Sequence, residues 1–250
     1  MLVGVREDDG DNAKMNEKDA VHRDNILTAI MLKLCILVLA TVSYVSSAGV
    51  SDANTFVDTI FREKMPFLVK GSPRLFPYAT IADFKFKVYK NQITNRDLKV
   101  NMTRGEIRGL DTALQRLGDC QAPFLRDGQT VVVCNLAVQG LNITFTSLAK
   151  GDTLVAIWKT IWVNVGVKDT MAQFEASAPI GQGGTLRTFL IDDIRLDVTY
   201  DSNLSLNEGR QQKFKEEIIV RVKDELRHIF YNDYKDLLRR AVESVTFPRI

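Results

Sequence analysis

Few residues of this chain are of the types that carry acid–base or nucleophilic chemistry. Only one of its two histidines, His228, lies beyond the first 48 residues, four positions after Asp224 in a helical pattern. A histidine and a carboxylate at this spacing form an ordinary pair on a helix surface. The sequence has no G-x-S-x-G, H-E-x-x-H, paired C-x-x-C or phosphate-loop motif. It therefore predicts a non-enzymatic protein without a metal site or cofactor.

Two further stretches resemble site motifs and are better explained as turns. The Gly181-Gln182-Gly183-Gly184 run lacks the following helix that a dinucleotide site needs. Asp192 and Asp193 are adjacent, and neighbouring residues on a strand point to opposite faces, which disfavours a metal or acid pair. Both stretches are predicted to be solvated turns.

Cys120 and Cys134 are predicted to form a disulfide. Cys35 lies in a segment that we expect to be removed, so an even number of cysteines remains in a secreted chain. A three-residue hairpin loop at Arg126-Asp127-Gly128 would place the two cysteines opposite each other on antiparallel strands.

Three N-glycosylation sequons begin at Asn101, Asn142 and Asn203. Asn101 and Asn142 fall on the polar faces of predicted strands, where a glycan has room. We expect all three asparagines to be glycosylation sites.

The N-terminal part resembles a targeting segment. Lys33 is followed by an apolar run from Leu34 to Ala40 and by small residues at Ser46-Ser47-Ala48, the layout of a cleaved secretory signal. A membrane anchor is the alternative, but the run is shorter than the ~20 residues of a membrane span. We therefore divide the chain into an extension with a signal peptide (1–48) and one domain (49–250), and expect an extracellular protein with no stable membrane anchor after cleavage.

The charge balance excludes one class of partner. The formal net charge is +2, and no run of lysine or arginine is present. Nucleic-acid binding is therefore not expected.

The region from Ser205 to Val245 is predicted to be one long helix around which the domain is built. Its apolar residues recur every three or four positions, on one face of a helix: Phe214, Ile218, Val222, Leu226, Ile229, Leu237, Ala241 and Val245. Ser205 and Glu208 form a capping-box pattern. Asn232-Asp233 interrupts the stripe, so we expect a kink or local exposure there.

The rest of the domain alternates in the manner of strands. A short helix is predicted over Ser51–Lys64, ended or bent by Pro66. Strand patterns follow at residues 83–88, 98–103, 105–110, 131–138, 141–146, 171–178, 186–190 and 194–200. The run Thr153–Val167, which contains Trp158 and Trp162, is apolar on both faces and is predicted to be a covered central strand. The fold class is α+β, a long curved antiparallel sheet wrapped around the C-terminal helix.

Arg104-Gly105-Glu106-Ile107-Arg108-Gly109-Leu110, followed by Leu114, Arg116, Leu117, Gly118 and Asp119, resembles a segment of the group 7 dust-mite allergen family. That family is similar to the tubular lipid-binding superfamily, which includes juvenile-hormone-binding and bactericidal/permeability-increasing proteins. Asp111-Thr112 departs from the small-residue pattern of the family. The resemblance implies a super-roll that holds a lipid-like ligand in an apolar groove between sheet and helix.

Two functions are consistent with these features. The first is a secreted carrier or sensor of a hydrophobic small molecule or lipid, with bacterial lipids and glycolipids among the candidates. The second is an extracellular protein-interaction module whose interior is fully packed. The large apolar residues that would line a groove, or simply form the core, are Phe61, Phe67, Phe84, Phe86, Trp158, Trp162, Phe174, Phe189, Ile218, Val222 and Phe230.

Overall fold

The computed structural model describes Lys33 and residues 49–90, 96–153 and 157–249. The chain divides into two compact units, Met1–Ala48 and Gly49–Ile250. Apart from Lys33, the predicted extension and signal peptide lie outside the described residues. All helices and strands given below belong to the second unit.

The strands form two antiparallel sheets, which confirms the predicted α+β class. The six-stranded sheet has the order β1-β3-β7-β8-β11, with β2 also paired to β3, and the five-stranded sheet has the order β10-β9-β6-β4, with β5 paired to β6. The strands of the first sheet are β1 (Ala79–Ile81), β2 (Phe84–Val88), β3 (Leu98–Arg108), β7 (Asn142–Lys150), β8 (Lys159–Lys168) and β11 (Arg195–Tyr200). Those of the second are β4 (Leu114–Arg116), β5 (Phe124–Arg126), β6 (Gln129–Val138), β9 (Thr170–Pro179) and β10 (Thr185–Ile191).

The strands are divided between two sheets, whereas the sequence predicted one, because the chain changes sheet at four connections: β3–β4, β6–β7, β8–β9 and β10–β11. The β6–β7 connection turns at Gly140, and the β8–β9 connection is Asp169 alone. Gly140 has φ +74° and Asp169 has φ +35°. At each point, the strand continues into the neighbouring sheet instead of folding back as a hairpin.

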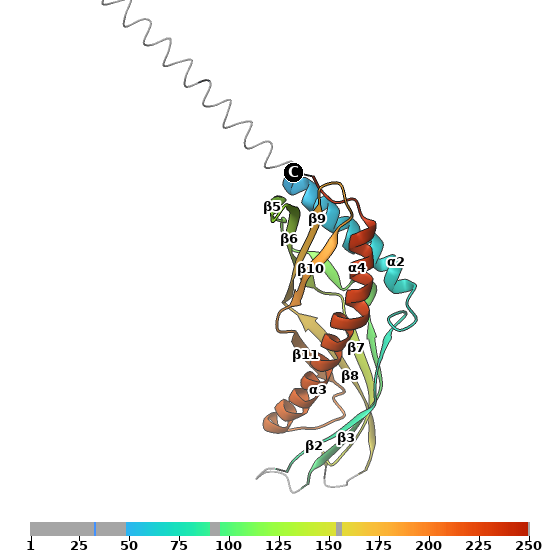
Figure 1. Ribbon diagram of the computed structural model, residues 1–250. Helices are drawn as coiled ribbons and strands as arrows, with labels where there is room; N and C mark the ends of the chain where they lie inside the picture. Colours follow the sequence, from blue (N-terminus) through green and yellow to red (C-terminus); the bar gives the residue numbers. More distant parts are fainter. Residues whose placement is uncertain (1–32, 34–48, 91–95, 154–156, 250) are drawn as a thin grey trace, which may run out of the picture. The chain divides into compact units, whose positions relative to one another are not determined.

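The terminal helix packs along both sheets (Figure 1). It consists of α3 (Glu208–Ile229), the π-helical segment η3 (Phe230–Tyr234) and α4 (Lys235–Ser244). α3 contacts β2 and β11, whereas α4 contacts β10. The helix begins later than the capping-box pattern predicted, because Asn207 is the N-cap and its side chain accepts a hydrogen bond from the Arg210 N–H at 3.1 Å.

The predicted interruption at Asn232-Asp233 is the π-helical segment. Its wider turn adds one residue, so the buried stripe continues through Tyr234 to Leu238, and Leu237 is only half-buried. The Asn232 side chain donates a hydrogen bond to the His228 carbonyl at 2.7 Å, which satisfies a carbonyl at this irregular turn.

The N-terminal helix runs through Pro66, where the sequence predicted an end or a bend. Residues 49–58 are α-helical, and η1 (Thr59–Lys64), a second π-helical segment, leads into α2 (Met65–Lys70). The Met65 N–H bonds to the Ile60 carbonyl, five residues back. This wide turn directly before Pro66 accommodates a residue that has no N–H to donate.

The Trp-containing run does not form a strand covered on both faces. β8 begins at Lys159, and residues 154–156 of the run lie outside the described residues. Within β8, Ile161, Val163 and Val165 are buried, whereas the alternate residue Trp162 is exposed. The strand therefore has one core face and one solvent face. The two strand patterns predicted at residues 98–103 and 105–110 also differ from the structure, because residues 98–108 form one continuous strand, β3.

Candidate functional site

Six of the predicted groove residues lie in the hydrophobic core: Phe61, Phe174, Phe189, Ile218, Val222 and Phe230. Phe61 and Phe174 contact each other edge to face, with their ring centroids 5.6 Å apart. Phe84 and Phe86 are partly buried against the same core. The other three predicted residues face solvent: Phe67 is 76% exposed, Trp158 46% and Trp162 48%.

The structure thus brings together the predicted residues of the interior, but as packed core. Ile218, Val222 and Phe230 are fully buried. None of them lines any of four pockets that lie among the described residues. Those pockets lie near the α4 end of the domain. Of the predicted groove residues, Phe67 lines two of these pockets, and sequence reasoning did not identify the other two.

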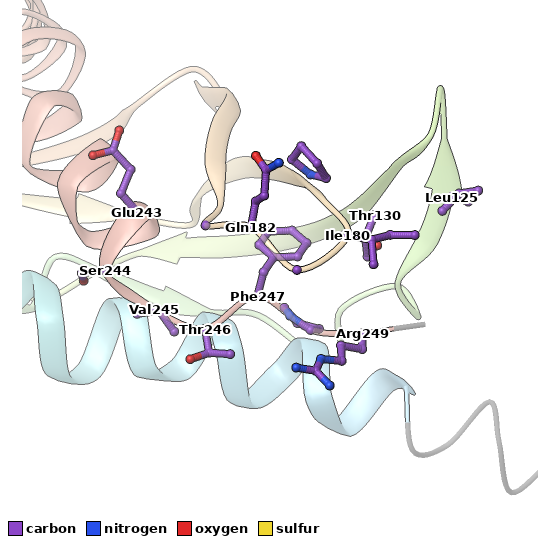
Figure 2. Close-up of a pocket in the computed structure, with 14 residues that line it drawn as sticks. Leu125, Thr130, Ile180, Gln182, Glu243, Ser244, Val245, Thr246, Phe247 and Arg249 are labelled. Carbon is purple, nitrogen blue, oxygen red and sulfur yellow. The ribbon is translucent and has the colours of Figure 1, made fainter.

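The best-defined of these hollows, the terminal pocket, has a volume of about 450 Å³. Three segments form it: the β5–β6 hairpin, the β9–β10 turn and the tail that follows α4 (Figure 2). Its lining residues are Leu125, Thr130, Pro179, Ile180, Gly181, Gln182, Gly183, Glu243, Ser244, Val245, Thr246, Phe247, Pro248 and Arg249. This volume is in the range of small-molecule sites.

The hairpin wall of the terminal pocket differs in its turn from the prediction. β5 ends at Arg126, which pairs with Gln129, so the loop contains two residues, Asp127 and Gly128. Both have positive φ, as a tight two-residue hairpin turn requires. The disulfide between Cys120 and Cys134 is nevertheless confirmed, with the two Cα atoms 4.5 Å apart. Cys120 precedes β5 and lies outside the paired residues of β5 and β6, so the two-residue turn does not fix its position relative to Cys134.

The tail wall is held by Phe247. Its ring packs on Phe56 of the N-terminal helix with centroids 4.9 Å apart. A Cβ atom at Gly184 would lie 2.8 Å from the Phe247 ring, so only glycine permits the turn to approach this closely. The exposed apolar side chains at the rim are Leu125 and Ile180.

The charges at the rim are Arg249 on the tail and Glu243 at the end of α4. Nearby, a polar network joins β6, β9 and β10: Arg187 donates to Ser177 at 2.7 Å and to Gln129 at 2.8 Å. The lining combines apolar side chains with polar ones, so the arrangement suits an amphiphile whose apolar part contacts Val245 and Phe247 and whose anionic group pairs with Arg249.

The groups weighed as catalytic candidates lie at the surface. His228 contacts Asn232, with 3.3 Å between Nδ1 and the amide nitrogen, and not the predicted Asp224. Asp193 accepts from Lys223 at 2.9 Å, and this ammonium group, with help from Arg227, lowers the pKa of the carboxyl. The Gly181–Gly184 stretch is a turn, closed by a hydrogen bond from the Gln182 N–H to the Pro179 carbonyl. The residues that the structure describes form no cluster suited to a metal ion.

The predicted glycosylation sites all lie outside the core. Asn142 and Asn203 are exposed, whereas Asn101 is half-buried between neighbouring strands. Among the described residues, no helix is both long and apolar enough to cross a membrane.

The fold and pocket define the chain as an α+β protein with two antiparallel sheets packed along a long C-terminal helix. No family model matches the chain. Lipopolysaccharide binding protein is a structural neighbour with 13% identity and a TM-score of 0.43, covering 78% of this chain and 38% of its own. Takeout 1 of Epiphyas postvittana has 11% identity and a TM-score of 0.31, covering 74% of this chain and 85% of its own. Similarities this low leave the fold to be judged from the chain's own elements.

A relative in sequence is much more similar. The salivary anticoagulant protein P23 of Ixodes scapularis is 45% identical over 222 residues, which cover 88% of this chain and all of the relative. The chain belongs to the family of this protein. Its resemblance to the group 7 dust-mite allergens stays a prediction.

Proposed function

We propose that this protein is a secreted, non-catalytic binding protein that slows blood clotting. The observation that carries the proposal is its 45% identity, over the whole length of the relative, to a protein named as a salivary anticoagulant. The disulfide between Cys120 and Cys134 supports secretion, since such bonds persist in oxidising compartments. The lack of a nucleophile or metalloprotease motif supports action by binding.

The test is the clotting time of recalcified plasma with increasing amounts of the purified protein. We expect a dose-dependent delay, and the same protein after heat denaturation serves as the control. Equal clotting times at concentrations at which P23 itself delays clotting would overturn the proposal. Hydrolysis of small chromogenic substrates by the clotting proteases, measured in parallel, shows whether the protein blocks a protease active site.

The terminal pocket favours a second function, the carriage of a hydrophobic small molecule or lipid. Its walls bring Val245, Phe247 and Pro179 together beneath the exposed Ile180, with Arg249 at the rim. A fatty acid or another amphiphile with one anionic group fits this chemistry, and a bacterial lipid or glycolipid would present its acyl part in the same way. The packed interior around α3 favours instead the interaction-module function, in which the surface alone binds.

Lipid extraction followed by mass spectrometry of protein secreted from eukaryotic cells distinguishes these two functions. For carriage we expect a bound amphiphile, and we expect this amphiphile to displace a fluorescent fatty acid from the protein. The I180S/L125S variant is expected to bind the fluorescent fatty acid at least about tenfold more weakly than the wild type, because each lost apolar contact is worth a large part of its burial energy. V220S, at an exposed position of α3, is the matched control. A protein that yields no lipid and binds no fluorescent fatty acid is not a carrier.

A further inference from the structure

Lysines gather on the outer face of the six-stranded sheet. Lys87 of β2 pairs directly with Lys99 of β3, and Lys99 pairs with Lys150 of β7, so three ammonium groups follow one another across three strands. One step along the sheet, Lys85 pairs with Asn101. We call these four lysines, together with Trp158 and Trp162, the lysine platform.

The platform faces away from the core. Lys99 alternates with the buried Leu98 and Val100, and Lys150 follows the buried Ala149. Directly paired residues of antiparallel strands share a face, so the four lysines point to the same side. The neighbouring outward positions are Asn101, Thr103, Thr146, Leu148, Thr160 and Trp162, none of which is a carboxylate. Further along β3, beyond its register shift, the outward Glu106 pairs with Arg108 at 2.6 Å.

This arrangement is unfavourable in isolation. Adjacent strands lie about 4.8 Å apart, and like charges directly opposite each other destabilise a sheet. Among the described residues, no carboxylate pairs with Lys85, Lys87 or Lys99. Several lysines elsewhere are paired: Lys168 with Asp197, Lys213 with Glu216 and Lys223 with Asp193. The platform therefore presents concentrated positive charge that the fold itself does not neutralise.

Aromatic side chains border this charge. Trp162 of β8 pairs directly with Thr146 of β7, and the exposed Leu148 lies two residues further along β7 on the same face. The Lys150 ammonium lies 5.7 Å from the Trp158 ring centroid. Exposed tryptophans beside lysines are typical of the interface between a lipid bilayer and water, where an amphipathic ring and a flexible cation are both favourable.

We infer that the lysine platform docks this protein reversibly on anionic phospholipid bilayers. The lysines attract the anionic headgroups, and Trp158, Trp162 and Leu148 insert among the headgroups and upper acyl chains. A sulfated polysaccharide would match the charge but offers no apolar phase for the tryptophans, so a bilayer accounts for more of the surface. The docking itself does not depend on the proposed function, whereas any effect of docking on clotting rests on that function.

The two platform tryptophans are the only ones in the chain. Intrinsic fluorescence therefore reports directly on the platform. We expect a blue shift and co-sedimentation with vesicles of phosphatidylcholine and phosphatidylserine, neither with phosphatidylcholine alone, and release at high salt. Binding without a fluorescence shift would place the contact elsewhere and overturn the inference, as would binding to heparin but not to vesicles.

The K87Q/K99Q/K150Q variant is expected to bind these vesicles about a hundredfold more weakly, because each lysine near an anionic surface contributes about a fivefold factor. The matched control is K70Q/K168Q/K213Q, which removes the same charge from side chains that are more than half exposed. Equal loss in both variants would overturn a specific platform. If the protein delays clotting but does not bind vesicles, only the docking inference is refuted. If it binds vesicles but does not delay clotting, only the anticoagulant proposal is refuted.

Discussion

At the scale of single residues, Tyr234 shows how burial in the terminal helix controls ionisation. It lies in η3, fully buried, with its ring 5.2 Å from Phe230. Burial raises the pKa of the phenol well above its ordinary value, with a smaller contribution from Asp111. The folded protein therefore keeps this proton at a pH at which the unfolded chain loses it.

The sign of the effect on stability follows from this difference. Below a pH of about 10, Tyr234 is protonated in both the folded and the unfolded state, so its contribution to folding stability is fully present. Above that pH, the tyrosine ionises only in the unfolded state, so the free energy of unfolding falls. We expect Tyr234→Phe to lose less unfolding free energy than the wild type between pH 8 and pH 11, measured by urea denaturation. Parallel losses in the two proteins would contradict the assignment to Tyr234.

The disulfide gives a second prediction for single residues. Cys120 and Cys134 are separated by 14 positions. Closing a loop of this size stabilises a chain by about 3 kcal/mol in the chain-entropy model. We expect the C120A/C134A variant to lose about this amount in urea denaturation at neutral pH. A reductant should lower the stability of the wild type and leave the variant unchanged.

The lysine platform makes a stability prediction of opposite sign. If Lys99 is retained for docking, then the repulsion from Lys87 and Lys150 costs stability. Lys99→Gln is expected to raise the midpoint of thermal unfolding slightly while it weakens vesicle binding. A structural role for Lys99 would instead lower both quantities.

At the scale of secondary structure elements, Arg210 joins the first turn of α3 to the connections at the end of the six-stranded sheet. Its side chain is 2% exposed and donates to the Gly151 carbonyl at 3.1 Å. Asp152 follows Gly151, and its buried carboxylate pairs with Lys159 at 2.5 Å. Arg210 thus satisfies a buried carbonyl and lies in the field of Asp152 and Asp97, while desolvation lowers its pKa.

Arg210→Met keeps most of the side-chain volume but removes the donors. We expect it to destabilise the domain by about 2–3 kcal/mol, the range for a lost charged hydrogen bond that leaves a buried acceptor unsatisfied. Arg221→Met, at an exposed site of the same helix, is the control. A loss below 1 kcal/mol for R210M would show that the α3 end is anchored mainly by apolar packing.

The helix and most strands were predictable from the sequence because their signals are local. The spacing from Phe214 to Leu226 marks the α3 stripe, and the alternation in residues 98–103 marks β3. The sequence did not predict that the buried position of the stripe moves from Leu237 to Leu238, since this move depends on the π-helical turn at Asn232. For Trp162, alternation with Ile161 and Val163 was available as a signal of an outward position, but the apolar content of the run suggested burial on both faces.

The sites depended on contacts that no local pattern contains. The terminal pocket joins segments that are far apart in the chain, around Leu125, Ile180 and Phe247. The platform depends on the registers of β2, β3 and β7, which place Lys87, Lys99 and Lys150 in one row. A change of register by one residue would turn each of these side chains to the opposite face. Composition and spacing showed the lysines but could not bring them together.

At the scale of the whole molecule, every helix and strand given above lies between Gly49 and Ile250, and this part forms a compact unit by itself. We therefore expect residues 49–250 expressed alone to unfold at the same urea midpoint as the full chain. When the full chain is secreted from insect cells, mass spectrometry of the mature protein should find its N-terminus within a few residues of Gly49, as cleavage after Ala48 predicts. A secreted protein that retains Lys33 would contradict the signal peptide, and a lower midpoint for the short form would show that residues before Gly49 support the fold.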